Sequence, residues 1–399
     1  MPLNPDDTAR HPNPLAEYYT KFRVGDRLLF TGHSHQAWPD CGFAGQQQAW
    51  LDAAELVDGK WERAFERADR VRKGFARLLG DSEGHIALAP NTHDLVIRFL
   101  SALPLGARPR LVTTDGEFHT IRRQLDRLAE ESVELVRVPA DDPETLAQRL
   151  AAEADSRTAA VLVSSVLFRS SRIVPGLGAL ADACERVGAR LLVDAYHALN
   201  VVPFSIPDEG LEHAFVVGGG YKYCQLGEGN CFLRFPAHCT LRPVITGWFS
   251  EFDVLAGSTP EGRVAYGQGP SRFAGSTYDP TSHYRAAEVF DFFTEQGMSP
   301  EWLRAVSRRQ ITRLASGFDD LDVDPKLISR DRVHPLEKIG GFLTLASPRA
   351  DAICAALKER GVLTDSRGSK LRIGPAPYLS DRQLDQVIDA LADVLGTMG

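Results

Sequence analysis

The sequence lacks any long uninterrupted apolar stretch. A helix that crosses a bilayer needs about 20 consecutive apolar residues, and no segment of the 399 residues approaches that length. The first residues, Met1-Pro-Leu-Asn-Pro-Asp-Asp, also lack the basic segment followed by an apolar one that is typical of a secretory signal. We therefore expect a cytoplasmic protein without contact to a membrane.

An excess of positive charge is also absent. The formal net charge is -8 at pH 7, and no dense group of Lys and Arg with interleaved aromatic residues occurs. Because nucleic-acid binding requires a basic surface, this balance argues against a general nucleic-acid-binding protein. Hydrophobic residues at 43% and charged residues at 25% are ordinary for a globular protein, and the length favours two domains.

Cysteine pairs at metal-binding spacing are missing. Without a C-x-x-C pair, reduced thiols are expected rather than disulfides or zinc ligands, and this applies to Cys41, Cys184, Cys224, Cys231, Cys239 and Cys354. His33-Ser34-His35 is the only dense histidine pair, and it has no further Cys, His or carboxylate nearby at ligand spacing. No metal site is therefore predicted.

What the sequence does contain is an alternation of strand-like and helix-like segments through its middle. The short apolar segments that indicate strands are His85–Leu88, Arg110–Thr114, Val133–Val138, Ala159–Val166, Arg190–Asp194, Ala214–Gly218 and Asn230–Phe235. Helical patterns lie between several of them, at Asp94–Leu103, Thr120–Glu130, Glu144–Ala152 and Leu177–Val187. This alternation predicts an α/β fold with a largely parallel sheet covered on both faces.

The pattern changes after about Pro280. Long amphipathic stretches (Ser282–Gln296, Pro300–Gly317, Arg349–Arg360 and Asp381–Leu395) flank a strand-like segment at Gly341–Ala346. We therefore expect a large domain over residues 47–281 and a small α+β domain over residues 282–399. Residues 1–46, rich in Pro, Gly and His, are expected to pack on the small domain or line the cleft, although a disordered lead-in remains an alternative.

An Asp, a His and a Lys follow two of the apolar runs. Asp194 ends Leu191-Leu-Val-Asp and His197 comes three residues later, while Lys222 follows Val216-Val-Gly-Gly-Gly-Tyr221. Alone, Asp194 could be a turn residue and Lys222 a solvated one. Together they suit pyridoxal phosphate (PLP), which needs a lysine amine for a Schiff base and a carboxylate that keeps the pyridine nitrogen protonated.

Several motifs carry a resemblance to a known family. Asp194-x-x-His197, Tyr221-Lys222, Gly247-Trp248-Phe249 and Leu371-Arg372-Ile-Gly-Pro375-Ala-Pro377 together resemble kynureninase, within the class V aminotransferase group of fold type I PLP enzymes. The similarity runs from about Leu28 to the carboxyl end. It implies the PLP-dependent transferase fold, with a mainly parallel seven-stranded sheet in the large domain and a small α+β carboxyl-terminal domain.

The resemblance also implies roles around the cofactor. Lys222 would form the Schiff base and move protons, Asp194 would pair with the pyridinium, and His197 would lie beside the ring. Thr92 and His93 would bind the phosphate at a helix start, Phe118 would stack on the ring, and Tyr221 would bind the phosphate and assist proton transfer. From the residues alone, an N-cap role for Thr92 and a core role for Phe118 or His197 remain open.

On the substrate side, the resemblance assigns Arg372 to the α-carboxylate and places Ser34 and His33 near the substrate. Trp248 and Thr277 would contribute cofactor contacts from the neighbouring subunit, which implies a homodimer with shared active sites. His33 and Thr277 stand where the family has amide side chains near the aryl end of the substrate. We therefore expect a modified kynurenine-like substrate.

The sequence thus predicts a PLP-dependent hydrolase of kynureninase type, which cleaves the Cβ–Cγ bond of a kynurenine-like L-amino acid and releases alanine. Two alternatives remain within PLP chemistry, a C–S or β-lyase and an aminotransferase. An alternative from another class is a non-catalytic sensor or assembly protein that retains the fold.

Overall fold

The main body is a seven-stranded sheet with helices on both faces. A computed structural model describes residues 3–254 and 262–398 of the chain. The strands run in the order β2-β8-β7-β6-β5-β3-β4. Their bounds are β2 His85–Ala89, β3 Arg110–Thr114, β4 Glu134–Val138, β5 Thr158–Ser164, β6 Arg190–Asp194, β7 Phe215–Gly219 and β8 Cys231–Phe235.

The sheet is parallel from β4 to β7, and only β8 runs against its neighbours β7 and β2. Every residue of β5 and of β7 is buried, which explains why these strands read as continuous apolar runs without alternation. The expected fold class is confirmed, including the number of strands and their mainly parallel arrangement.

Helices connect the parallel strands, as the alternation of patterns predicts. They are α3 Thr92–Ser101, α4 His119–Ala129, α5 Pro143–Glu153, α6 Leu177–Val187 and the single turn α7 Ile206–Glu209. Local sequence sets their starts: the Asn91 side chain accepts from the amide of Asp94 at α3, and Asp142 caps α5 just before Pro143.

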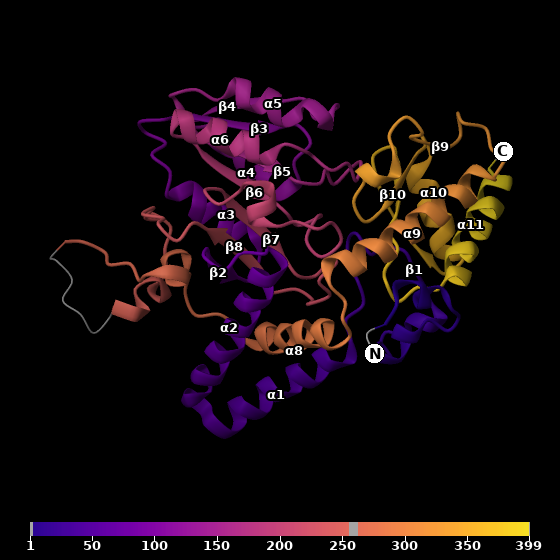
Figure 1. Cartoon of the computed structure of the whole chain (residues 1–399), viewed down its shortest axis with the longest axis horizontal. Coiled ribbons are helices and arrows are strands. Elements are labelled where there is room, and N and C mark those ends of the chain that lie inside the picture. Colours follow the sequence, from indigo (N-terminus) through magenta and orange to yellow (C-terminus); the bar gives the residue numbers. More distant parts are fainter. Residues whose placement is uncertain (1–2, 255–261, 399) are drawn as a thin grey trace.

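A separate helical layer covers the lower part of the large body in Figure 1. It consists of α1 Asp40–Leu56, α2 Lys60–Leu78 and α8 Thr281–Glu295, which pack against one another. Close packing of α2 on α8 depends on Gly74, because a Cβ there would lie 2.4 Å from Cδ2 of Phe290. The sequence patterns did not predict α1 or α2.

The carboxyl-terminal part forms its own antiparallel sheet, in the order β12-β13-β10-β9. Its elements are α9 Pro300–Asp319, β9 Ser329–Arg330, β10 Leu343–Ala346, α10 Ala350–Glu359, β12 Asp365–Arg367, β13 Lys370–Ile373 and α11 Asp381–Gly396. The domain limits at 46/47 and 281/282 remain a proposal, since α8 follows the second limit and packs on α1 and α2.

The amino-terminal segment lies beside this smaller sheet (Figure 1). Strand β1 (Leu28–Leu29) pairs in parallel with β11 (Val362–Leu363). Two residues further on, Thr31 forms a single parallel bridge with Gly374, which follows β13. Short 3-10 turns occur at Pro5–Ala9, Pro14–Tyr18, Val24–Asp26, Val57–Gly59, Trp248–Ser250, Phe252–Val254, Gly269–Phe273 and Leu336–Lys338.

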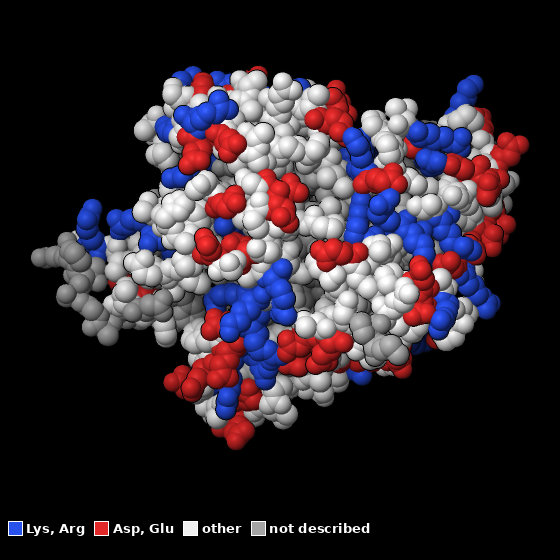
Figure 2. All heavy atoms as spheres, viewed as in Figure 1, with Lys and Arg blue, Asp and Glu red and all other residues white. Residues whose placement is uncertain are grey.

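Acidic and basic side chains are interspersed over the face seen in Figure 2, which agrees with the absence of a single basic field from the sequence. Within the described residues, no helix has the length and apolarity that a membrane crossing requires. The same part of the chain contains no group of three or more His, Cys, Asp or Glu side chains arranged to hold a metal.

Candidate active site

A cavity of about 440 Å³ opens at the carboxyl ends of the parallel strands. This edge of a parallel sheet is where ligands bind in open α/β folds. Seven of the predicted residues line the cavity, coming from β6, the segment after β7, and the starts of α3 and α4: Thr92, His93, Phe118, Asp194, His197, Tyr221 and Lys222.

Lys222 lies on the segment that follows β7, and its side chain is buried. Its Nζ is 2.8 Å from Nε2 of His197 and 4.4 Å from the ring centroid of Tyr196. Burial lowers the pKa of Lys222 to about 7, although Asp194 opposes the shift. The amine is therefore available in its neutral, nucleophilic form near neutral pH.

Asp194 ends β6 and stands half-buried at the cavity wall, where its carboxylate accepts the amide of Tyr196 at 2.8 Å. Burial raises the pKa of Asp194, and the nearby Lys222 only partly opposes this. A carboxylate in such surroundings gains strongly from a cation placed against it. His197, three residues later, has its pKa lowered well below the usual value by burial and by Lys222.

The start of α3 closes one end of the cavity. Thr92 is the first residue of that helix and His93 the second, so their backbone amides belong to the first turn, which has no intrahelical acceptor. The amides and the helix dipole together make this turn suitable for an anion such as a phosphate.

Two aromatic side chains form further walls. Phe118 precedes α4, and its ring centroid lies 5.3 Å from the Lys222 amine and 5.4 Å from the ring of Phe168. Tyr221 packs between Tyr196, at 4.9 Å, and His35, which stacks on it at 4.8 Å and 18°. Flat rings thus face the Lys222 amine from different elements.

Arg372 does not line the cavity but touches its wall. Its Nη1 donates 2.7 Å to the backbone oxygen of Phe168, which is a lining residue. The remaining edge of its guanidinium is paired with Asp365. The charge of Arg372 is nevertheless close enough to contribute to the lowered pKa of Lys222.

Ser34 and His33 are also outside the lining residues. Ser34 lies 3.1 Å from Nδ1 of His35, whereas His33 is fully buried, bonded to Asp365 at 2.8 Å and stacked on Phe342 at 4.6 Å. Direct contact of His33 with a substrate therefore has no support in this geometry.

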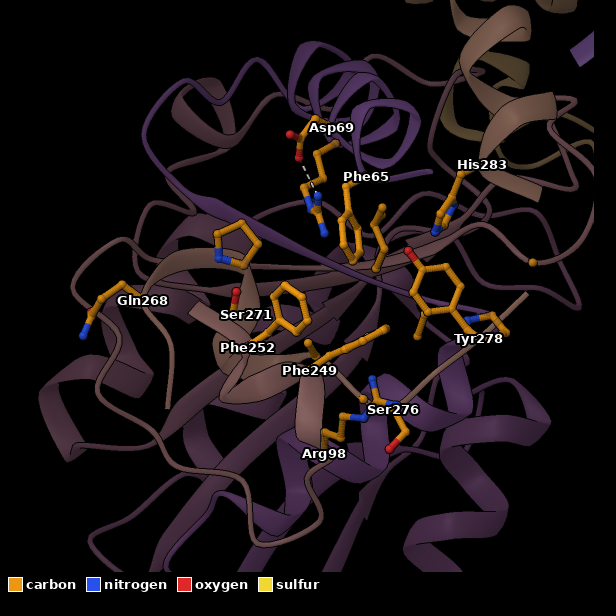
Figure 3. A pocket seen from close by; sticks show the side chains of 18 residues that line it. Phe65, Asp69, Arg98, Phe249, Phe252, Gln268, Ser271, Ser276, Tyr278 and His283 are labelled. Carbon is orange, nitrogen blue, oxygen red and sulfur yellow. Dashed lines mark hydrogen bonds and ion pairs between the residues drawn. The ribbon is translucent and has the colours of Figure 1, made fainter. Parts of the chain in front are cut away.

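Trp248 and Thr277 are not brought to the cavity of their own chain. Nε1 of Trp248 donates 3.1 Å to Oγ1 of Thr277, and the Trp248 side chain is exposed. Their neighbours Phe249, Ser276 and Tyr278 line a second, aromatic cavity of about 360 Å³ (Figure 3). The two cavities share Pro90 and Gly229 and are therefore adjacent.

Comparison with known proteins identifies relatives of the whole chain and of its carboxyl-terminal part. Residues 329–391 match the family described as "Kynureninase C-terminal domain". An uncharacterised aminotransferase of Bacillus subtilis (strain 168) is 22% identical, with 86% of this chain and 88% of the relative aligned. A kynureninase of Geobacillus thermodenitrificans (strain NG80-2) is 26% identical, with 85% and 81% aligned.

Solved structures support the fold. A C-DES mutant with glycine covalently linked to its PLP cofactor superposes with a TM-score of 0.82 at 16% identity, over 95% of this chain and 99% of that one. The carboxyl-terminal part of the chain thus matches the kynureninase family, and most of the chain is similar to kynureninases and to an aminotransferase. The solved structure that the chain resembles contains PLP, and the likeness shows that the two proteins share a fold.

The cavity of this kynureninase-like chain fits PLP in three respects. Asp194 offers a carboxylate for the pyridinium, and the start of α3 offers amides for the phosphate. The third is Nδ1 of His197, a buried polar atom that has no hydrogen-bond partner within the described residues and belongs to a side chain of the cavity wall. A polar group on the cofactor ring would satisfy that atom.

Sequence reasoning missed two residues that pack behind the lining of the cavity, His35 and Glu117. His35 stacks on Tyr221, whereas its sequence pattern indicates at most one of two histidine ligands of a metal site. Glu117 is buried directly before Phe118 and accepts hydrogen bonds from Thr114, at 2.7 Å, and from Ser164, at 2.6 Å. The position of Glu117 beside Phe118 is the one signal that could have indicated it.

Proposed function

We propose that this protein is a PLP-dependent hydrolase of kynureninase type, which cleaves the Cβ–Cγ bond of a kynurenine-like L-amino acid and releases alanine. The observation that carries the proposal is the kynureninase carboxyl-terminal match over residues 329–391, which contains Arg372, a residue one contact away from the cavity of Lys222. PLP bound there supplies an electron sink for the charge left at the α-carbon.

In this proposal the residues that line the cavity hold and tune the cofactor. Lys222 binds it covalently, and Asp194 keeps its pyridine nitrogen protonated through an opposite charge. His197 directs its Nδ1 to the ring substituents, and Thr92 and His93 bind the phosphate together with Tyr221. Phe118 covers one face of the ring.

Nζ of Lys222 would also take up the proton from the α-carbon of the substrate and return it. A general base works best when its pKa is near the operating pH, and the lowered pKa of Lys222, about 7, meets that condition. The 2.8 Å contact with His197 fixes the direction of the amine when it is free.

Substrate recognition falls to Arg372 and the amino-terminal loop. Arg372 binds the α-carboxylate, for which a planar guanidinium is well suited, and Ser34 lies near the substrate. Trp248 and Thr277 reach the cofactor of a second copy, so the working form is a homodimer with shared sites. Neither residue lines the cavity of its own chain, which supports this arrangement.

A desulfurase-type reaction has less support. It would need a nucleophilic cysteine, and Cys231, which does line the cavity, is buried with its pKa raised to about 12. Such a thiol stays protonated and inert at neutral pH. Cys224 is also buried, and burial likewise raises its pKa well above the usual range.

The test is product analysis with a panel of amino acids. Purified protein loaded with PLP is incubated with L-kynurenine, ring-hydroxylated kynurenine and a non-aromatic γ-keto amino acid, with Lys222→Ala as the control. We expect alanine from at least one of them, and none with the variant. Keto acid or pyruvate without alanine would replace this proposal by an aminotransferase or lyase, and no product at all would favour a non-catalytic role.

A further inference from the structure

Asp365 faces Arg372 across a tight hairpin. Strands β12 and β13 are antiparallel, and their register places the Cα of Asp365 directly opposite that of Arg372. Side chains at opposed positions lie on the same face of a sheet within contact distance. The turn between the strands contains Gly368 with a φ of +57°, which glycine adopts without strain.

The carboxylate of Asp365 occupies one edge of the guanidinium. Nε of Arg372 donates to Oδ1 at 2.7 Å and Nη2 donates to Oδ2, while Nη1 donates to the oxygen of Phe168. A guanidinium has five N–H groups, of which these contacts use three. Nη1 and Nη2 therefore each retain one N–H for another acceptor.

His33 holds the other side of the same carboxylate. Its Nε2 lies 2.8 Å from Oδ1 of Asp365, and its ring is stacked on Phe342. The backbone at Gly374 fixes the ring position, because a Cβ at that residue would lie 2.2 Å from Nδ1 of His33. Burial lowers the pKa of His33 to about 4, so the ring is neutral and donates one N–H to the carboxylate.

The three side chains together carry no net charge. Burial would raise the pKa of Asp365, but hydrogen bonds from His33 and Arg372 outweigh it and hold the pKa well below the usual range. Asp365 is therefore ionised and balances Arg372. A second carboxylate approaching Arg372 meets directed N–H groups rather than an unpaired cation, so orientation decides binding.

We propose that Asp365 is the positioning residue for substrate recognition: it takes the Nε–Nη2 edge of Arg372 and thereby presents the free N–H groups of Nη1 and Nη2 to the α-carboxylate. His33 acts through Asp365, not by contact with the far end of the substrate. This inference rests on the proposed role of Arg372 and adds a residue, Asp365, that the sequence motifs do not indicate.

The test measures carboxylate recognition without turnover. Protein loaded with PLP is titrated with two matched pairs, L-alanine with ethylamine and L-kynurenine with kynuramine, and binding is followed by the absorption of the cofactor. The affinity ratio within a pair reports the α-carboxylate alone. We expect Asp365→Asn to lower this ratio about tenfold or more, because an amide cannot accept from both Nε and Nη2, while the cofactor content stays unchanged.

Two further variants separate positioning from folding. His33→Ala should lower the ratio by a smaller factor, and His33→Gln, whose amide can still donate to Asp365, should restore it; this pair decides the question if Asp365→Asn does not fold. Arg367→Ala is the matched control on the same hairpin. The side chain of Arg367 is exposed, and its Nη2 lies 3.8 Å from Oδ2 of Asp365, which is too far for a hydrogen bond. This control should leave the ratio unchanged.

Three results would overturn the inference. An unchanged ratio in Asp365→Asn would remove the positioning role, and an increased ratio would mean that Asp365 competes with the substrate. If the wild-type protein binds the amines as tightly as the amino acids, Arg372 does not bind the α-carboxylate, and this inference fails as well. Failure to release alanine from any member of the panel of γ-keto amino acids would contradict the proposed reaction alone.

Discussion

At the scale of residues, ionisable groups in the cavity and directly behind its wall lie in surroundings that disfavour their charge. Lys222, His197 and Glu117 are all buried, and burial is the largest cause of the pKa shift in each. Of these three groups, Lys222 and Glu117 each have a pKa of about 7 and therefore titrate in the range where enzymes work. Their pH dependence can therefore be predicted from the structure.

Capture of PLP should follow the titration of Lys222. Only the neutral amine attacks the aldehyde, and the pKa of Lys222 is lowered to about 7. The rate at which the cofactor-free protein binds added PLP should rise with pH and level off above about pH 7. Stopped-flow absorbance at a series of pH values measures this, and a rate that keeps rising towards pH 10 would show an amine with an ordinary pKa.

Glu117 should make stability depend on pH. Burial raises its pKa to about 7, so the folded state favours the protonated form. Its contribution is complete below about pH 4.5 and is lost as the pH rises through about 7, up to roughly 3 kcal/mol. In Glu117→Gln, the amide can bond Thr114 and Ser164 without titrating, so the variant should gain on the wild type over this range.

Urea unfolding of both proteins between pH 5 and 8 checks the expectation for Glu117, because other titrating groups cancel in the difference. A difference in unfolding free energy that is constant with pH would contradict it.

The sequence could predict Asp194, Lys222 and the helix start at Thr92, because each follows an apolar run that ends at the same edge of the sheet. It could not predict that Asp365 meets Arg372 and His33. That contact depends on the register of a hairpin and on an amino-terminal loop more than 300 residues away in sequence. Neither can be read from local spacing.

At the scale of elements, predicted limits of the strands and helices around the large sheet lie within two residues of the observed ones. The reason is that buried parallel strands carry strong continuous apolar signals. Helix α2 was missed although one face of it is buried, at Ala64, Ala68, Val71 and Phe75. Helix α1 was missed because its apolar pattern is weak. On α1, the side chains of Phe43, Trp50 and Leu51 are exposed, so its apolar residues do not follow a single buried stripe.

Packing of α2 on α8 should be sensitive to one added methyl group. Gly74→Ala would place a Cβ against the ring of Phe290, which must move, and we expect a loss of about 1–3 kcal/mol. Gly59→Ala is the control, since the nearest atom to its Cβ is 3.7 Å away. Thermal unfolding compares the two, and equal midpoints would contradict the packing described.

At the scale of the whole molecule, most of the exposed large apolar side chains of the described residues lie in two regions. One region includes Phe43, Trp50 and Leu51 on α1, and the other includes Val244, Ile245, Trp248 and Phe252 in the segment after β8. Trp248 is 46% exposed and lies outside the cavity of its own chain. These features support the proposed homodimer, in which Trp248 and Thr277 serve the partner's site.

Hybrid dimers should recover activity if the sites are shared. Lys222→Ala and Trp248→Ala proteins, each weak or inactive alone, are unfolded together and refolded as a mixture. A hybrid contains one site with an intact Lys222 and an intact Trp248 from the other chain, so the mixture should exceed both parents. If Trp248 serves its own chain, mixing would restore nothing.

The proposed function depends most on one claim, that the cavity at Lys222 is the PLP site. Borohydride reduction of the protein loaded with PLP, followed by peptide mass mapping, tests this directly because reduction fixes the cofactor to the amine that holds it. We expect a pyridoxyl-phosphate adduct on the peptide that contains Lys222. An adduct on another lysine, or none at all, would contradict it.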